Sequence, residues 1–212
     1  MAQRMALTLA VGIFIGIATS AHGEMIVNGG FEDAPLAPFG SWVEVPGGCS
    51  FPGWTVGGQG VDLHNTYHTT AHSGNQSLDL SGLEPGSITQ SVATTPGTTY
   101  LLSFWYSGQP FHPYDGDAYA EVFWDGGLVD TVHLPASPSP TDINWTFASY
   151  ELPTNTTSSL LMFNSLSPNG GIMLDDISLN AVPEPSTLLL FGIGAFGITS
   201  FAWWKRRFRC IP

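Results

Sequence analysis

Two adjacent carboxylates close the regular part of the chain. Asp175 and Asp176 lie in a run that is typical of a β-strand, and its alternation places Asp175 on the face of Met173, Ile177 and Leu179. We expect that face to be the core face. A buried carboxylate is costly unless it is protonated, hydrogen-bonded to backbone amides or bound to a metal ion. The run therefore predicts either a cation site or carboxylates that cap backbone amides at the end of a strand.

The charged residues are distributed unevenly. All five basic residues lie at the ends of the chain, at Arg4 and at Lys205, Arg206, Arg207 and Arg209. Of the 17 acidic residues only Glu184 lies outside residues 24–181, so that region contains 16 carboxylates and no Lys or Arg. No carboxylate there can pair with a Lys or Arg of the same region. Such a surface does not bind a polyanion, which excludes nucleic acid as a partner.

Three histidines recur at a spacing of four: His64, His68 and His72. On a helix this spacing would place three imidazoles on one face and suggest zinc. The residues between them have poor helix propensity and run into the turn sequence Ser73-Gly74-Asn75. In a loop the spacing has no such meaning, so we expect solvated loop histidines, with metal binding as the alternative.

Aromatic and acidic side chains gather around a long turn near residue 114. Tyr114 and Asp115 lie in the turn, Trp105 and Tyr119 point outward from the flanking strands, and Tyr67 lies in another loop. Proteins often hold sugars with an aromatic ring against the apolar sugar face and with polar groups on the hydroxyls. The pattern indicates glycan binding. The alternative is that these rings cover the ends of the fold.

No enzyme signature is present in the sequence. A glycosidase needs two carboxylates held about 5–9.5 Å apart in environments that separate their pKa values. Asp115 and Asp117 are close together on one turn, which suits neither role. There is also no G-x-S-x-G sequence, phosphate-binding glycine loop or Cys–His signature. The sequence therefore favours a noncatalytic protein.

The elements that position these residues are strands. Between residues 24 and 181, turn sequences such as Pro85-Gly86 and Asp125-Gly126-Gly127 separate short runs rich in Thr, Val and aromatic residues. Alternation predicts one strand face from Tyr100, Leu102, Phe104 and Tyr106. About ten such strands predict one all-β domain, a β-sandwich of jelly-roll type.

The two ends have a different character. Residues 1–23 combine Arg4, a short apolar run and the small-residue site Ala21-His22-Gly23, which predicts a secretory signal peptide. Residues 182–212 contain an apolar stretch at about 187–204, followed by the basic tail 205–209. That stretch predicts a short transmembrane helix, and the tail should stay cytoplasmic.

The C-terminal segment resembles the PEP-CTERM sorting signal of Gram-negative bacteria. The resemblance is carried by Val182-Pro183-Glu184-Pro185, the apolar stretch and the arginine-rich tail, in that order. It implies that an exosortase recognises the Pro-Glu-Pro segment during export. The protein is then expected in the cell envelope or extracellular matrix, anchored in the inner membrane at least before processing.

The middle region resembles the bacterial choice-of-anchor C domains and related secreted domains of plant cell walls. The matching blocks are Asn28-Gly29-Gly30-Phe31-Glu32, Pro52-Gly53-Trp54, Gly74-Asn75-Gln76-Ser77-Leu78-Asp79 and Leu174-Asp175-Asp176-Ile177. Both groups resemble galactose-binding-like jelly rolls and carbohydrate-binding modules. The resemblance implies a structural Ca²⁺ held by Glu32 and Asp175, with Asp176 as the poorer alternative. Calcium accepts such oxygen ligands in a flexible shell.

These observations predict an exported, envelope-anchored binding module, sorted by an exosortase, whose partner is an extracellular polysaccharide or matrix. The alternative is a structural surface or biofilm-matrix protein with no small-molecule ligand.

Overall fold

The computed structural model describes residues 25–34, 42–82, 84–111, 117–168 and 170–182. The expected signal peptide, transmembrane segment and basic tail lie outside these ranges. Within them, no helix has the length and apolar character needed to cross a membrane.

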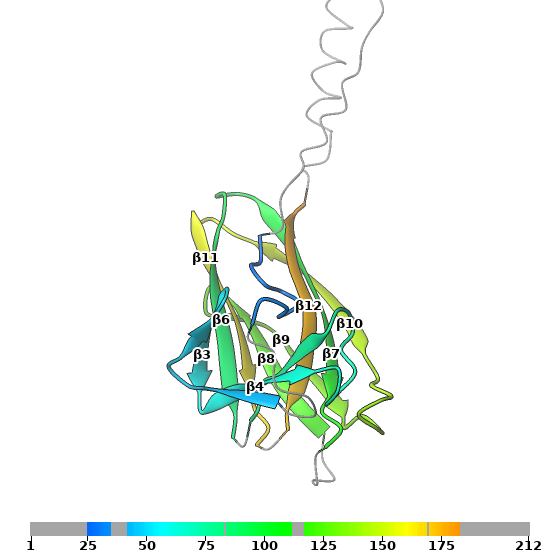
Figure 1. The fold of residues 1–212 in the computed structure, drawn as a ribbon. Helices are drawn as coiled ribbons and strands as arrows, with labels where there is room; N and C mark the ends of the chain where they lie inside the picture. The colour runs from blue at the N-terminus through cyan, green and yellow to red at the C-terminus, as the bar shows by residue number, and fades with distance from the viewer. Residues whose placement is uncertain (1–24, 35–41, 83, 112–116, 169, 183–212) are drawn as a thin grey trace, which may run out of the picture.

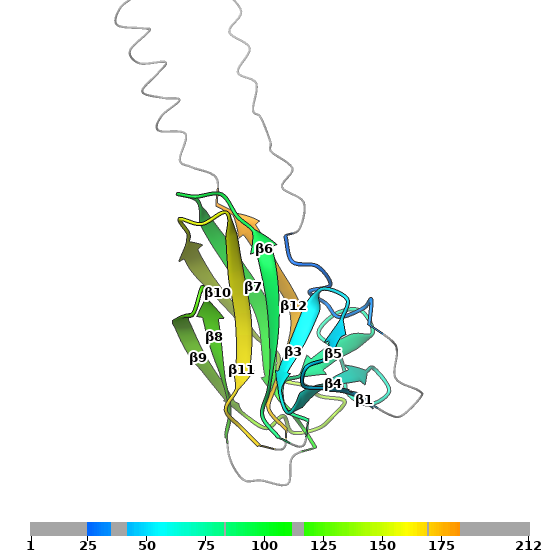
Figure 2. The same ribbon diagram turned by 90° about the vertical axis from the view of Figure 1, so that its left-hand side faces the viewer.

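The described residues form an all-β sandwich of two facing sheets (Figures 1 and 2). The strands are β1 (Trp42–Pro46), β2 (Ser50–Phe51), β3 (Trp54–Gly58), β4 (Gly60–Asn65), β5 (Gln76–Asp79), β6 (Gly86–Ala93), β7 (Thr99–Gly108), β8 (Asp117–Trp124), β9 (Gly127–Pro135), β10 (Thr146–Pro153), β11 (Ser158–Ser165) and β12 (Ile172–Ala181). Sheet A has the order β1-β4-β5-β12-β7-β10, and sheet B has the order β2-β3-β6-β11-β8-β9. Every named strand pairing is antiparallel.

The core lies between the inner faces of the two sheets. On β7 the buried Tyr100, Leu102 and Phe104 alternate with less buried neighbours, as the period of two predicts. Phe104 meets Phe163 of β11 edge to face, with ring centroids 5.0 Å apart, so the two sheets are joined by aromatic packing.

The segment 25–34 ties the two sheets together and lies beside β12 in Figure 1. Gly29 O accepts a hydrogen bond from Ile177 N of β12, at 3.0 Å. On the other sheet, Val27 N donates to the Gln90 side chain of β6, and Trp54 Nε1 of β3 donates to Asn28 O. Phe31 is fully buried against Trp54 and Phe51. The opening block of the domain is therefore part of the core.

Candidate functional site

A β-bulge decides where the carboxylates of β12 point. The pairing of β12 with β7 shifts register between Asp175 and Ser178, and Asp176 has a positive φ of 50°. Asp175 is opposite Trp105, whereas Leu174 is opposite Tyr106. The expectation that Asp175 shares a face with Ile177 and Leu179 is therefore wrong. The extra residue reverses the alternation, so Asp175 lies on the outer face of sheet A, the face of Trp105.

Asp175 is nevertheless fully buried, because the segment 66–75 between β4 and β5 covers this part of the outer face. Its carboxylate accepts hydrogen bonds from Ser73 N at 3.1 Å and from Asp176 N at 2.7 Å. Burial raises the pKa of Asp175 to about 7, and the charge of Asp176 adds to the rise while the backbone amides oppose it. These contacts are those expected of a carboxylate that caps backbone amides.

The three residues expected to hold calcium gather around Gly30. A Cβ on Gly30 would lie 3.5 Å from Asp176 Oδ1, 3.7 Å from Asp175 Oδ1 and 4.0 Å from Glu32 Cγ. Glu32 accepts hydrogen bonds from Asn75 N at 2.6 Å and Gln76 N at 2.8 Å. Among the described residues, no three His, Cys, Asp or Glu side chains stand close enough to hold a metal ion. The three carboxylates are neighbours, and each has hydrogen-bond partners within the fold. Backbone amides donate to Glu32 and Asp175, and the side chains of His72 and Ser73 donate to Asp176.

The three histidines have three different environments. His64 lies in β4 and is buried, so the expectation of a solvated loop residue is wrong for it. Burial, and then His68, lower its pKa to about 3, which keeps the imidazole neutral. His68 packs between His64 and Phe111, with ring centroids 4.7 Å and 4.4 Å away. His72 stands apart, with Nδ1 2.6 Å from Asp176 Oδ2.

An aromatic surface adjoins the carboxylates on the outer face of sheet A; we call it the Trp105 patch, made of His72, Trp105, Trp145 and Phe147. The His72 ring stacks on Trp105 at 3.9 Å and 15°. Phe147 lies across the strand pair from Trp105, with centroids 5.3 Å apart, and is 53% exposed. Trp145 meets His72 edge on at 6.0 Å, and its Nε1 donates to Thr70 O. The alternation of Trp145 and Phe147 along the chain was the available sequence signal for these two rings.

The other residues expected to bind glycan do not join this patch. Tyr119 of β8 belongs to sheet B, where it stacks on His133 with centroids 5.5 Å apart. Tyr67 lies in the covering segment and is 64% exposed. Tyr114 and Asp115 lie outside the described residues. The structure thus places Trp105 and Tyr119 on different sheets, because β7 belongs to sheet A and β8 to sheet B.

Sequence reasoning missed a pair of buried carboxylates, Asp62 and Asp79. They are direct cross-strand partners on β4 and β5. Asp79 Oδ1 accepts hydrogen bonds from Ser81 N and Gly171 N, whereas Asp79 Oδ2 and Asp62 Oδ1 have no hydrogen-bond partner among the described residues. Burial raises the pKa of Asp79 to about 8 and that of Asp62 to about 6, and Glu44 adds to the second rise.

The fold and the sequence are both similar to those of known proteins. The sandwich shares its fold with three solved structures, at 15% to 19% identity. TmCBM61 in complex with β-1,4-galactotriose has a TM-score of 0.51 and 19% identity over 76% of this chain and 100% of its own. The K1 adhesin domain of Lys-gingipain from Porphyromonas gingivalis W83 has a TM-score of 0.50 and 15% identity, covering 68% and 100%. A cyclase from Fischerella sp. TAU has a TM-score of 0.51 and 16% identity, covering 77% and 98%.

The fold is therefore a two-sheet β-sandwich that resembles the fold of TmCBM61. Because a cyclase shares it, the fold alone does not separate binding from catalysis. Over residues 24–158 the chain matches the family described as "Protein of unknown function (DUF642)", and it belongs to that family. Residues 181–207 match the PEP-CTERM protein-sorting motif, which implies an exported cell-surface protein sorted by an exosortase.

Two curated proteins are similar in sequence. Halomucin of Haloquadratum walsbyi is 28% identical over 180 residues, which is 81% of this chain and 2% of halomucin. The Arabidopsis thaliana "Protein DUF642 L-GALACTONO-1,4-LACTONE-RESPONSIVE GENE 2" is 28% identical over 178 residues, which is 76% of this chain and 47% of the plant protein. The chain spans less than half the length of each.

Proposed function

We propose that this protein is an envelope-anchored, noncatalytic module that binds an extracellular polysaccharide through the Trp105 patch. An exosortase handles the segment from Val182 to Pro185 during export, the apolar stretch at about 187–204 holds the protein in the inner membrane before processing, and the basic tail stays in the cytoplasm. The second candidate is a structural surface or matrix protein without a small-molecule ligand.

The observation that carries the proposal is the aromatic surface beside acidic groups. Phe147 is half exposed on edge strand β10 and packs against Trp105, on which the His72 ring stacks. The hydrogen bond from His72 to Asp176 holds the His72 ring flat on Trp105, which fixes the orientation of the patch. Rigid aromatic rings next to polar acceptors suit the apolar face and the hydroxyls of a sugar.

One of the structural neighbours suggests a first polysaccharide to test. TmCBM61 shares the fold and was solved with β-1,4-galactotriose. We therefore expect the full-length chain to be retarded by β-1,4-galactan, or by another neutral polysaccharide of a panel, in affinity electrophoresis. Phe147→Ala should weaken that binding about tenfold, since an exposed ring that stacks on a sugar contributes on the order of 1–2 kcal/mol. Trp105→Ala should weaken this binding at least as much, because it removes the ring on which His72 stacks and against which Phe147 packs.

Tyr119→Ala is the matched control, because it removes an exposed ring of similar size from sheet B. It should leave the retardation unchanged. If no polysaccharide of the panel retards the chain, the structural candidate replaces the binding proposal. New reducing ends released from a bound polysaccharide would contradict a noncatalytic role.

We also propose Ca²⁺ as a structural ion at Glu32 and Asp175, with Asp176 as the poorer alternative. The support is their position around Gly30 in a region with no Lys or Arg. Calcium at 100 times its dissociation constant would add about 2.7 kcal/mol of stability. We therefore expect Ca²⁺ to raise the Tm of the EDTA-treated chain by roughly 5–10 °C.

Glu32→Gln is the informative variant for this ion. It keeps an oxygen for the amides of Asn75 and Gln76 and removes the charge that calcium prefers. The rise in Tm should disappear in this variant. An unchanged Tm of the unsubstituted chain on adding Ca²⁺ would end the calcium proposal.

A further inference from the structure

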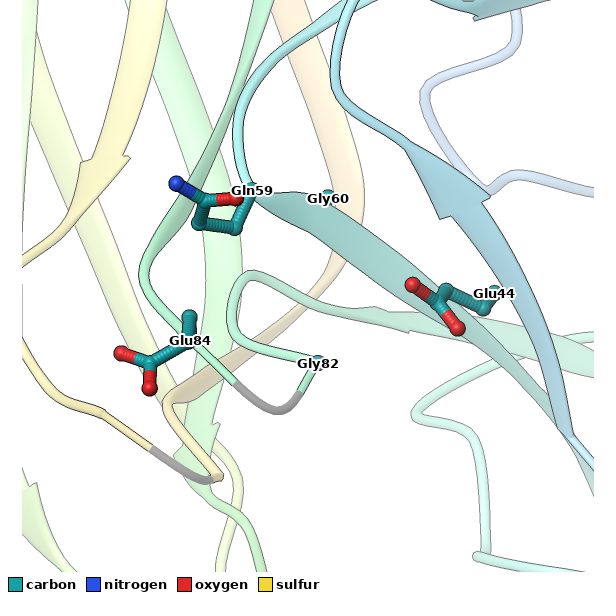
Figure 3. A pocket seen from close by; sticks show the side chains of 5 residues that line it. All are labelled: Glu44, Gln59, Gly60, Gly82 and Glu84. Atoms are coloured by element: carbon teal, nitrogen blue, oxygen red, sulfur yellow. The ribbon is translucent and has the colours of Figure 1, made fainter.

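A small acidic pocket lies at the β1 side of sheet A. Its volume is about 200 Å³, and Figure 3 shows Glu44 of β1 on one side and Gln59 and Glu84 on the other, with Gly60 and Gly82 between them. This volume is several times the ~30 Å³ that a water molecule occupies in the liquid. It is smaller than the ~300 Å³ at which sites for drug-sized ligands begin. One monosaccharide-sized group therefore fits it.

The pocket is negatively charged and has no internal counter-charge. Glu44 is the cross-strand partner of Asp62, so two carboxylates form a row across β1 and β4. Asp79 of β5, the next residue along, does not add to this charge at neutral pH, because burial raises its pKa to about 8. Residues 24–181 contain no Lys or Arg that could neutralise this row. An external cation is therefore attracted to the pocket.

Asp62 gives independent support for a ligand. It is only 9% exposed, and its Oδ1 has no hydrogen-bond partner among the described residues. The side chain extends from the same face of sheet A as Glu44 and lies against the pocket wall, since a Cβ on Gly82 would be 3.2 Å from Asp62 Oδ1. An unpaired, buried carboxylate behind a pocket wall strengthens the attraction for a cation in the pocket.

The geometry does not suit a bare metal ion. The described residues contain no group of three His, Cys, Asp or Glu side chains that could hold one, and Glu44 and Glu84 line different sides of the pocket. A larger cation can contact Glu44 and Glu84 at the same time. Its ammonium group can donate to Glu44, and its hydroxyl groups can donate to Glu84 and to the Gln59 amide oxygen.

We infer that this pocket binds the ammonium-bearing ring of an amino sugar, as found in a deacetylated hexosamine glycan. The site is separate from the Trp105 patch, since β5 and β12 lie between β4 and β7 in sheet A. The inference goes beyond the proposed function and does not depend on it. Acetylation of the amine removes the positive charge and adds bulk, so the acetylated sugar is the natural comparison.

The test titrates the full-length chain with a glucosamine trisaccharide by calorimetry, at low and at moderate salt. We expect binding that is about tenfold tighter than that of the N-acetylglucosamine trisaccharide, and that weakens as salt rises. Glu44→Gln should weaken it about tenfold.

The control Glu151→Gln removes one exposed carboxylate from β10, far along sheet A from the pocket, and should change nothing. Phe147→Ala should also leave this binding intact, which separates the pocket from the Trp105 patch. Equal affinity for the acetylated trisaccharide would overturn the inference. Equal losses of affinity in Glu44→Gln and Glu151→Gln would also overturn it, and so would binding of trilysine as tight as that of the glucosamine trisaccharide. Either result would mean that the ligand is attracted by the overall negative charge of the protein and not by the pocket.

Discussion

Gly29→Ala is expected to lower the free energy of unfolding by about 3 kcal/mol, with a fall in Tm of roughly 6–12 °C. A Cβ at this position would lie 1.9 Å from Ile177 O and 2.9 Å from Ile177 C, which are backbone atoms of β12. The segment 25–34 would have to move away and lose the hydrogen bond from Ile177 N to Gly29 O. Thermal unfolding followed by circular dichroism measures the effect.

Gly30→Ala is the matched control, because it makes the same change one residue along the chain. There a Cβ would have its nearest neighbour at 3.5 Å, an ordinary van der Waals distance. In calcium-free buffer its Tm should fall by much less than that of Gly29→Ala. Equal Tm values for the two variants would show that the close approach of the opening block to β12 is not what stabilises the domain.

Stability is also expected to fall as the pH rises from 6.5 to 9. Asp79 has a pKa of about 8 in the folded chain and an ordinary value of 3.8. Between these values the folded state keeps a proton that the unfolded state has lost, so the free energy of unfolding falls as the pH rises. Above pH 8 both states have lost the proton, and this contribution to stability is gone. One pKa unit is worth about 1.4 kcal/mol, so the interval from 6.5 to 8 costs about 2 kcal/mol. The Tm should fall by roughly 4–8 °C.

The starting pH of 6.5 avoids an opposite effect. The pKa of His64 is lowered to about 3 from an ordinary 6.5, so below 6.5 the unfolded state takes up a proton that the folded state excludes. Acidification below that point therefore destabilises the fold through His64. Asp175 has a pKa of about 7, so it adds a smaller loss of stability with rising pH, in the same direction as Asp79.

Asp79→Asn should remove most of the dependence of the Tm on pH between pH 6.5 and 9. The amide oxygen can still accept the hydrogen bonds from Ser81 N and Gly171 N, and no charge has to be buried. The variant should be the more stable protein at pH 9. Asp117→Asn, on the exposed start of β8, is the control and should keep the full dependence. A Tm that is flat with pH in the unsubstituted chain would contradict the protonated state of Asp79.

Several features could be predicted from the residues alone. The alternation on β7 correctly predicted its buried face, and the turn sequences predicted an all-β sandwich. The sorting segment could be identified because its signal is a short contiguous sequence. The absence of Lys and Arg predicted that buried carboxylates would be protonated, bonded to backbone amides or bound to a metal ion. Asp79 and Asp175 accept hydrogen bonds from backbone amides, and burial raises the pKa of both.

Other features depended on the pairing of distant strands. The bulge at Asp175 and Asp176 reverses the alternation of β12, and nothing in that run of sequence marks the reversal. Trp105 and Tyr119 are 14 residues apart in the chain but lie in different sheets, whereas Trp105 and Phe147 are 42 residues apart and face each other across a strand pair. The pairing of Asp62 with Asp79 has the same origin, since register in a sheet joins residues that sequence order does not.

The sequence by itself thus determined the class of fold, the sorted C-terminus and the absence of internal cations, because each is a property of composition or of contiguous residues. The tertiary structure decided which carboxylates lie together, which aromatic rings form a patch and which histidine is buried. Those depend on strand register, a bulge and the covering segment 66–75, which come from the packing of the whole chain.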